Sequence, residues 1–268
     1  MREQQTARAV QRVIETMTFK KMWELRSELD GAPVWDLCLL GRMVSHDPRG
    51  QGEVRVAKVV VLDVDGTLMD TNYLHTEAWA RAFEEIGHRT PRAEIHKQIG
   101  KGSDKLIPGF VEDEQKGERA DELHGELYLK MQEHGHPLPG AKELIASLAE
   151  RGYEVWFVTS AKPEELEQYL EQLETEGRVS GIVNSSDVEN SKPAPDIFEL
   201  ALEKAGATPG ETVAVGDAVW DVEAADRAGI RTVAVLTGGA FSEEELKEAG
   251  AVEVYKDCAA LLDSGFPE

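Results

Sequence analysis

A regular alternation of strand-like and helix-like segments beyond residue 57 constrains the fold of this chain most strongly. The run from Val56 to Leu62 is apolar and rich in valine, as expected of a strand buried on both faces of a parallel sheet. Further strands are predicted at 153–158, 181–184, 212–215, 231–235 and 252–255, and helices at 74–86, 141–151, 163–174, 195–206, 221–228, 242–249 and 257–263. This order predicts an α/β fold with a Rossmann-like, doubly wound parallel sheet.

The charge of the chain changes near residue 57. The 268 residues include 29 Lys and Arg against 51 Asp and Glu, for a net charge of −22 at pH 7. Residues 1–57 are close to neutral, so the acidic excess lies beyond them. Residues 1–55 are predicted to be an N-terminal extension with an amphipathic helix within 4–28. The extension either packs on the main body, is partly disordered, or contacts a partner or a second copy, which would make a homo-oligomer.

Composition also excludes several classes of function. The acidity argues against general nucleic-acid binding, which needs a basic surface, and against binding to anionic lipid. No apolar run is long enough for a membrane span, and the first residues lack the apolar stretch of a signal peptide, so we expect a cytoplasmic protein. The cysteines, Cys38 and Cys258, form no CxxC pair, which argues against a disulfide scaffold or a cysteine zinc site.

Polar residues of matching chemistry follow four of the predicted strands, where open α/β sheets bind their ligands. Asp63 and Asp65 come directly after the first strand and precede Gly66. Two carboxylates at this spacing can serve as a nucleophile and an acid/base, and the glycine allows a sharp turn toward a ligand. Capping of a turn is the alternative role for such aspartates.

The other three strand ends fit the same chemistry. Thr159 and Ser160 suit a phosphate oxygen at a helix start, although an ordinary helix cap is the alternative. Lys192 lies in a loop stiffened by two prolines and either neutralises anionic charge or is simply solvated. Asp217 and Asp221 follow the strand at 212–215, and hard carboxylate oxygens favour Mg²⁺ over zinc.

Taken in order, these motifs resemble those of the haloacid dehalogenase superfamily of hydrolases. They read DVDGT at 63–67, VTS at 158–160, SKPAPD at 191–196 and VGDAVWD at 215–221. The segment between the first two motifs looks like the small α-helical cap of the phosphoglycolate phosphatase and β-phosphoglucomutase branch. The resemblance implies a catalytic core of residues 56–72 and 138–268, with the cap inserted after the first strand at 73–137.

The resemblance also implies roles for the motif residues. Asp63 would attack phosphorus to form an aspartyl-phosphate, and Asp65 would be the general acid and base. Mg²⁺ would be bound by Asp63, by the backbone carbonyl of Asp65 and by Asp217, with Asp221 as a further ligand or a support. Substrate contacts would come from Gly66, Thr159, Ser160 and Lys192. Ala218 and Ser160 depart from the usual residues of the pattern without removing a catalytic group.

Substrate specificity is expected to depend on the cap. Lys101, in the loop 99–105, either contacts a second anion of a phosphorylated acid or sugar such as phosphoglycolate, or is solvated. The loop lacks the Arg-Ser-Leu arrangement of the mutases, so a phosphatase acting on a small phosphorylated metabolite is preferred. A sugar phosphomutase and a non-enzymatic binding protein are the alternatives. His134 and His136 are expected to lie at the surface, His75 near the cap hinge, and Trp220 near the site entrance.

Overall fold

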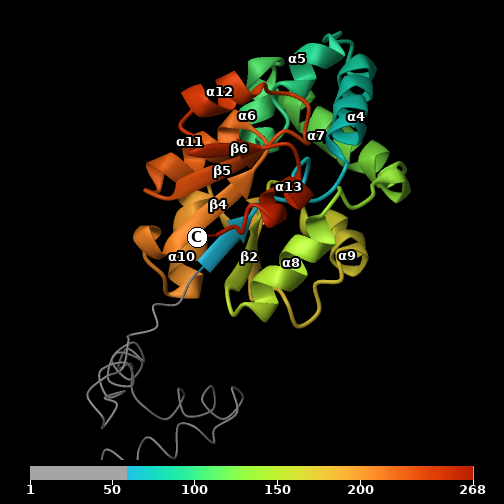
Figure 1. Ribbon diagram of the computed structural model, residues 1–268. Coiled ribbons are helices and arrows are strands. Elements are labelled where there is room, and N and C mark those ends of the chain that lie inside the picture. Colours follow the sequence, from blue (N-terminus) through green and yellow to red (C-terminus); the bar gives the residue numbers. More distant parts are fainter. Residues whose placement is uncertain (1–58, 268) are drawn as a thin grey trace, which may run out of the picture. The chain divides into compact units, whose positions relative to one another are not determined.

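The computed structural model describes residues 59–267, which form a parallel sheet with helices on both faces and a helical segment above one edge of it (Figure 1). The strands are β1 (Val59–Leu62), β2 (Glu154–Val158), β3 (Gly181–Val183), β4 (Thr212–Gly216), β5 (Arg231–Val235) and β6 (Glu253–Tyr255). Every pairing is parallel, and the strand order is β3-β2-β1-β4-β5-β6. This confirms the predicted fold class.

The first strand occupies the centre of the sheet. Its four residues are fully buried, and Val61 pairs with Trp156 of β2 on one side and Ala214 of β4 on the other. A strand with neighbours and helices on both sides has no polar face, which is why its sequence is a continuous apolar run. Because β1, β2 and β4 are parallel, the loops that follow them all begin at the same edge of the sheet.

Two layers of helices cover the sheet. They are α8 (Ala141–Glu150), α9 (Pro163–Gln172), α10 (Asp196–Ala205), α11 (Val219–Arg227), α12 (Glu243–Glu248) and α13 (Cys258–Asp263). Apolar residues of α8, α9 and α13 pack against Val60 and Leu62, whereas those of α10 and α11 pack against Val59 and Val61. The alternation along β1 thus supplies both halves of the core.

Four helices between β1 and β2 form the segment above the carboxyl edge. They are α4 (Asn72–Glu85), α5 (Arg92–His96), α6 (Ser103–Leu106) and α7 (Glu114–Leu129), with α4 packed along α7. This segment has an apolar cluster of its own, which includes Trp79, Phe83, Ile95 and Leu106. A separate core fits the predicted helical cap, whose boundaries at 73 and 137 stay a prediction. Short 3₁₀ turns lie at Ile107–Gly109, Gln132–His134, Ser185–Asp187 and Pro209–Glu211.

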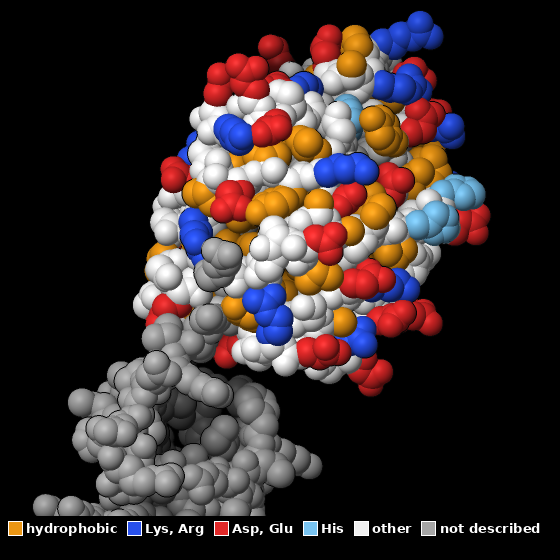
Figure 2. Space-filling model, viewed as in Figure 1, with side chains coloured by type: hydrophobic (Ala, Val, Ile, Leu, Met, Phe, Trp, Pro, Cys, Tyr) orange, Lys and Arg blue, Asp and Glu red, His pale blue; other side chains and the backbone are white. Residues whose placement is uncertain are grey.

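The predicted extension, residues 1–55, lies outside the described residues, as does Cys38. On the face shown in Figure 2, acidic side chains are spread over the helices of both cap and core, with basic side chains among them. The acidic stretch from Glu112 to Glu126 is mostly exposed on and before α7, as expected, but Asp121 and His124 face inward. Within residues 59–267, no helix is long and apolar enough to span a membrane.

Candidate active site

The first motif forms a tight turn at the end of β1. Asp63 and Asp65 are each more than nine-tenths buried. Gly66 has a φ of +79°, and a Cβ atom at this position would lie 2.2 Å from the Asn72 amide nitrogen and 2.6 Å from an Asp217 oxygen. Only glycine combines this left-handed backbone with so close an approach. Gly66 therefore brings the start of α4 against the fourth motif.

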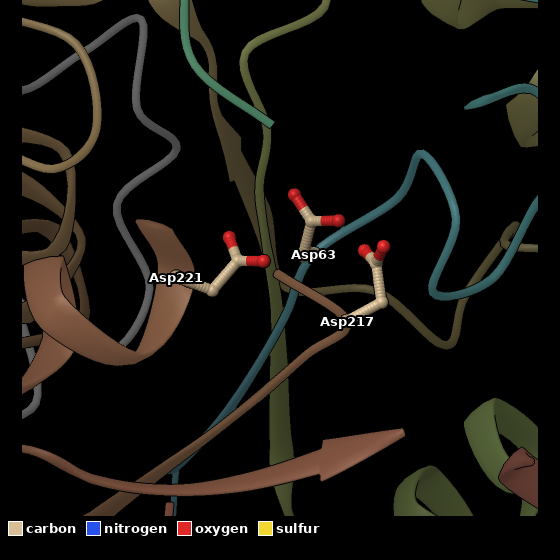
Figure 3. Close-up of side chains that lie close together, drawn as sticks. All are labelled: Asp63, Asp217 and Asp221. Atoms are coloured by element: carbon tan, nitrogen blue, oxygen red, sulfur yellow. The ribbon is translucent and has the colours of Figure 1, made fainter. Parts of the chain in front are cut away.

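Three buried carboxylates from two motifs converge at the carboxyl edge of the sheet (Figure 3). Asp63 follows β1, Asp217 follows β4, and Asp221 lies in the first turn of α11. One oxygen of each carboxylate lies within 4.8 Å of the others. The sequence placed these residues at strand ends, and the parallel pairing of β1 with β4 brings them together.

Lys192 is fully buried beside this cluster. Its ammonium nitrogen lies 2.6 Å from Asp63 Oδ1 and 2.7 Å from Asp221 Oδ1, and it donates to the Val158 carbonyl at 3.0 Å. Burial lowers the pKa of Lys192, but the charges of Asp221 and Asp63 raise it above its ordinary value overall. The lysine is therefore a permanent cation, and the alternative of a solvated loop lysine is wrong.

The carboxylates exceed the cationic charge available to them. Burial first, and then the charge of Asp221, raise the pKa of Asp63 to about 7, even though Lys192 opposes this shift. Burial and the charges of Asp221 and Asp63 likewise raise the pKa of Asp217 well above its usual range. Three carboxylates beside a single ammonium leave negative charge in a low-dielectric site.

The oxygens of this cluster are oriented by donors from the first motif and from α4. Thr67 Oγ1 lies 3.1 Å from Asp63 Oδ2 and 3.0 Å from Asp217 Oδ1, so its single proton serves one of them at a time. Asn72 donates to Asp217 Oδ2 at 3.0 Å. The amide of Ala218 donates to Asp221 Oδ2 at 3.1 Å. Asp221 thus closes the first turn of α11 while it supports Lys192.

Asp65 lies in a different environment from Asp63. Its Oδ1 accepts from the Thr71 hydroxyl at 2.7 Å and lies 3.2 Å from His75 Nε2, and the Thr159 hydroxyl lies 3.4 Å from Oδ2. Burial alone would raise the pKa of Asp65, but the charge and hydrogen bond of His75, together with the Thr71 hydrogen bond, lower it. Burial lowers the pKa of His75, and Asp65 reverses this shift, so the pair holds one proton.

The remaining predicted residues surround the same site. Thr159 is buried, and its hydroxyl accepts the Ala161 amide at 3.0 Å while it approaches Asp65. Ser160 donates to the Gly100 carbonyl of the cap at 2.9 Å. Lys101 contacts Gln98 at 2.6 Å and lies over the Trp220 ring at 3.7 Å.

A cavity of about 60 Å³ lies between the aspartates of the first motif and the helical cap segment. Asp63 and Asp65 line it from the core, and Lys101 lines it from the cap. Trp220 donates to the Lys97 carbonyl at 3.0 Å, and the Gly102 amide donates to Ser191 Oγ at 3.0 Å. The cap therefore contacts the core beside the cavity, and Trp220 lies at that contact as expected.

Several residues of the site were not predicted. The motif pattern indicated strand ends and missed Thr71 and Asn72 at the start of α4. It also missed His124 of α7, which contacts His75. The polar sequence Asp70-Thr71-Asn72 directly after the first motif was the available signal. His134 and His136 are exposed, as expected of surface residues.

Three buried carboxylates around a buried lysine, at the carboxyl edge of a doubly wound sheet and under a helical segment, are typical of one class of hydrolase. The chain belongs to the haloacid dehalogenase-like hydrolases, whose family model matches residues 57–229. The family predicted from the four motifs is therefore confirmed, and so is the prediction of an enzyme at the level of this family.

Two curated relatives illustrate the match. A phosphorylated carbohydrates phosphatase of Thermotoga maritima is 28% identical over 204 residues, which cover 74% of this chain and 94% of that protein. Protein SUPPRESSOR OF QUENCHING 1, chloroplastic, of Arabidopsis thaliana is 32% identical over 207 residues. That match covers 74% of this chain but 19% of the plant protein, so the chain spans only a small part of its length.

A solved structure agrees with the fold. A hydrolase from Pseudomonas syringae superposes with a TM-score of 0.74 at 32% sequence identity. The superposition covers 77% of this chain and 97% of the bacterial one. The described sheet and cap segment therefore have a close structural counterpart.

Proposed function

We propose that the protein is a Mg²⁺-dependent phosphatase that hydrolyses a small phosphomonoester through an aspartyl-phosphate intermediate. One observation carries this proposal: the fully buried ammonium of Lys192 lies between Asp63 and Asp221, in a cluster where Asp217 completes three carboxylates. A carboxylate can attack an anionic phosphoryl group only where nearby cations neutralise both. The name of the Thermotoga relative, a phosphatase of phosphorylated carbohydrates, supports the same chemistry.

The donor set fits Mg²⁺. The three carboxylates are buried, lie within 4.8 Å of one another and include no histidine or cysteine, which suits a hard, oxygen-binding cation. The raised pKa values of Asp63 and Asp217 show that this set lacks positive charge. Asp63, Asp217 and the Asp65 carbonyl would hold the ion, which would neutralise charge on the phosphoryl group. Asp221 Oδ1 forms an ion pair with Lys192 at 2.7 Å, and we propose that Asp221 supports this lysine or serves as a further ligand.

In the proposed reaction, Asp63 is the nucleophile. Lys192 fixes Oδ1, and Oδ2 becomes available whenever Thr67 donates to Asp217 instead. This oxygen forms a bond to phosphorus while the phosphorus–oxygen bond of the ester breaks and its electron pair stays with the leaving alcohol. Lys192 and the hydroxyl of Thr159 are proposed to contact the transferring group. We propose that Ser160 and Gly66 are positioning residues. Ser160 donates to the Gly100 carbonyl, and the missing side chain of Gly66 leaves room for Asn72.

Asp65 is the proposed proton carrier. The leaving alcohol takes the single proton that Asp65 shares with His75, by way of the Asp65 carboxyl. The water that then hydrolyses the aspartyl-phosphate returns a proton to the same pair. Thr71 holds Asp65 Oδ1 in place for both steps. The proposed roles therefore follow from the neighbours of each residue. Asp63, beside Lys192, is the nucleophile, and Asp65, beside His75, transfers the proton.

The size of the cavity supports a small substrate. The cavity volume of about 60 Å³ is small beside the roughly 300–1,000 Å³ of a typical ligand pocket. A leaving group of a few carbon atoms fits this space under the cap. Lys101 is the candidate contact for an anionic substituent. The proposed substrate is therefore a small phosphorylated acid or sugar, and cytoplasmic location stays a prediction.

The proposal is tested by measuring phosphate release from a panel of small phosphomonoesters with Mg²⁺ and with EDTA. We expect activity only with Mg²⁺, and we expect Asp63→Asn to abolish it while the circular dichroism spectrum and melting temperature show an intact fold. Wild-type turnover in Asp63→Asn, after contamination is excluded, would refute the assigned nucleophile. A requirement for a sugar bisphosphate, with an isomerised product in place of free phosphate, would instead identify a phosphomutase.

A further inference from the structure

Three buried side-chain atoms on α7 lack hydrogen-bond partners among the described residues. They are Oδ1 of Asp121, Nδ1 of His124 and the hydroxyl of Tyr128. Asp121 and His124 are separated by one helical turn and therefore share a face of α7. Both also line the cavity that contains Asp63 and Asp65. Neither residue belongs to the four motifs, and neither is used in the reaction proposed above.

The environment of Asp121 leaves one oxygen ready to accept a hydrogen bond. Its Oδ2 forms an ion pair with Lys162 at 3.0 Å, which joins the cap to the loop after β2. Oδ1 has no partner among the described residues, and Asp121 is one of the residues that line the cavity. A buried carboxylate oxygen is costly unless a donor meets it. The site is therefore complementary to a ligand that donates a hydrogen bond there.

The environment of His124 narrows the chemistry of that ligand. Its Nε2 lies 3.2 Å from His75 Nδ1, and its ring stacks on Trp79 with centroids 4.0 Å apart. Burial and the charge of His75 lower the pKa of His124 well below its usual value, so the ring is neutral. A neutral imidazole presents one donor and one acceptor nitrogen.

A hydroxyl group matches both atoms. A carboxylate or phosphoryl oxygen of the substrate can only accept, and it would be repelled by Asp121. An ammonium group would be repelled by Lys162, 3.0 Å from the same carboxylate. A hydroxyl group donates to Asp121 Oδ1 and can either accept from or donate to His124.

We propose that Asp121 is a specificity-determining residue that accepts a hydrogen bond from a hydroxyl group of the leaving alcohol, with His124 as the second partner of that hydroxyl. The substrate class is then the phosphate esters of small polyhydroxylated alcohols. This inference rests on the proposed phosphatase function and adds to it the chemistry that the cap selects.

The test compares two substrates that differ only in hydroxyl groups, sn-glycerol 3-phosphate and propyl phosphate. The readout is the ratio of their kcat/KM values, measured with Mg²⁺ for the full-length chain. We expect the wild-type ratio to favour glycerol 3-phosphate, and we expect Asp121→Ala to lower it by about tenfold or more, as for loss of a hydrogen bond to a charged group. Asp121→Asn keeps an oxygen acceptor and should restore part of the ratio.

Two further variants separate recognition from structure. Glu126→Ala removes an exposed acid of the same helix that is paired with Arg119, and it should leave the ratio at the wild-type value. Lys162→Met breaks the ion pair but keeps Asp121 Oδ1, so it should lower the ratio less than Asp121→Ala.

If Asp121→Ala and Lys162→Met lower both kcat/KM values in proportion, the ratio stays at its wild-type value. Asp121 is then a structural link between cap and core, and the inference is overturned while the phosphatase proposal stands. Failure of the wild-type chain to release phosphate from any ester would overturn both.

Discussion

At the scale of single residues, Asp217 is held in a slot between two glycines. A Cβ atom on Gly238 would lie 1.6 Å from Asp217 Oδ2, and one on Gly66 would lie 2.6 Å from the same atom. The slot also contains Asn72, whose amide donates to Asp217 and to the Gly238 carbonyl. The position of this carboxylate therefore depends both on the hydrogen bond from Asn72 and on the absence of a Cβ atom at Gly66 and Gly238.

This packing predicts a large effect from a single methyl group. In Gly238→Ala, the new methyl must displace the Asp217 carboxylate, because it would lie 1.6 Å from Oδ2. The backbone of Gly238 is not left-handed, so the substitution adds no backbone strain of that kind. We expect phosphate release to fall on the order of 100-fold, as for a reacting group misplaced by about 1 Å. Gly210→Ala is the matched control, since nothing lies within 4 Å of its added methyl. Equal activity of the two variants would contradict the prediction.

The titration of the carboxylate cluster predicts how Mg²⁺ stabilises the protein. An unfolded aspartate has a pKa near 3.8, whereas that of Asp63 in the fold is about 7. Between these values the folded state holds a proton that the unfolded state has released. The contribution of Asp63 to the free energy of unfolding therefore falls as pH rises through this range. Mg²⁺ competes with that proton, so its binding should be stronger at higher pH.

The measurement is the melting temperature with EDTA and with MgCl₂ at pH 5.5 and pH 8. We expect the increase caused by Mg²⁺ to be larger at pH 8, where the carboxylates are ionised. The same increase at both pH values would show that the bound ion does not displace protons from this cluster. Asp63→Asn, which lacks the titrating group, should show a smaller difference between the two pH values.

Residues of the site differ in how far the sequence could predict them. Asp63 and Asp217 follow the buried strands β1 and β4, whose parallel pairing brings their carboxyl ends together, so the convergence of these two residues could be predicted. Lys192 lies nine residues beyond β3, so its position in the site was less directly indicated. Asp121 and His124 lie in a polar helix whose acidic residues all look alike in sequence. Which of its side chains turn inward depends on how α7 packs against α4, and that packing is a tertiary property.

At the scale of elements, the strands and long helices of the core could be predicted within a few residues. Apolar runs such as 212–215 and the capping box of Ser242 and Glu245 mark their own boundaries, and the structure confirms both. In the cap, α5 and α6 have five and four residues, too few to show a periodic pattern. The sequence therefore indicated only that this region is rich in helix.

The long cap helix offers a prediction about stability. Gly125 lies in the interior of α7, and nothing lies within 4 Å of a methyl added there. Gly125→Ala should raise the free energy of unfolding by about 0.5–1 kcal/mol, because alanine loses less backbone entropy in a helix. In Gly117→Ala, the methyl would lie 2.9 Å from Ile107 Cγ2, so its gain should be smaller. Urea denaturation of the two variants checks the difference, and a larger gain for Gly117→Ala would contradict it.

At the scale of the whole molecule, the candidate active site, the sheet and the cap segment all lie within the described residues 59–267. We therefore expect a chain of residues 56–268 to fold and to release phosphate as the full-length chain does. If residues 1–55 join two copies of the chain, the shorter chain should also elute as a monomer in size-exclusion chromatography. An inactive or unfolded 56–268 chain would contradict the prediction that residues 1–55 are an extension outside the catalytic core.

The central place of β1 in the sheet has a consequence for synthesis. Asp63 is made early, but its partner Lys192 follows 129 residues later, and Asp217 is made later still. Until these residues leave the ribosome, β1 lacks its neighbour β4, and the aspartates of the first motif remain hydrated and uncompensated. By the proposed mechanism, a nascent chain should release no phosphate before Lys192 and Asp217 have joined the first motif.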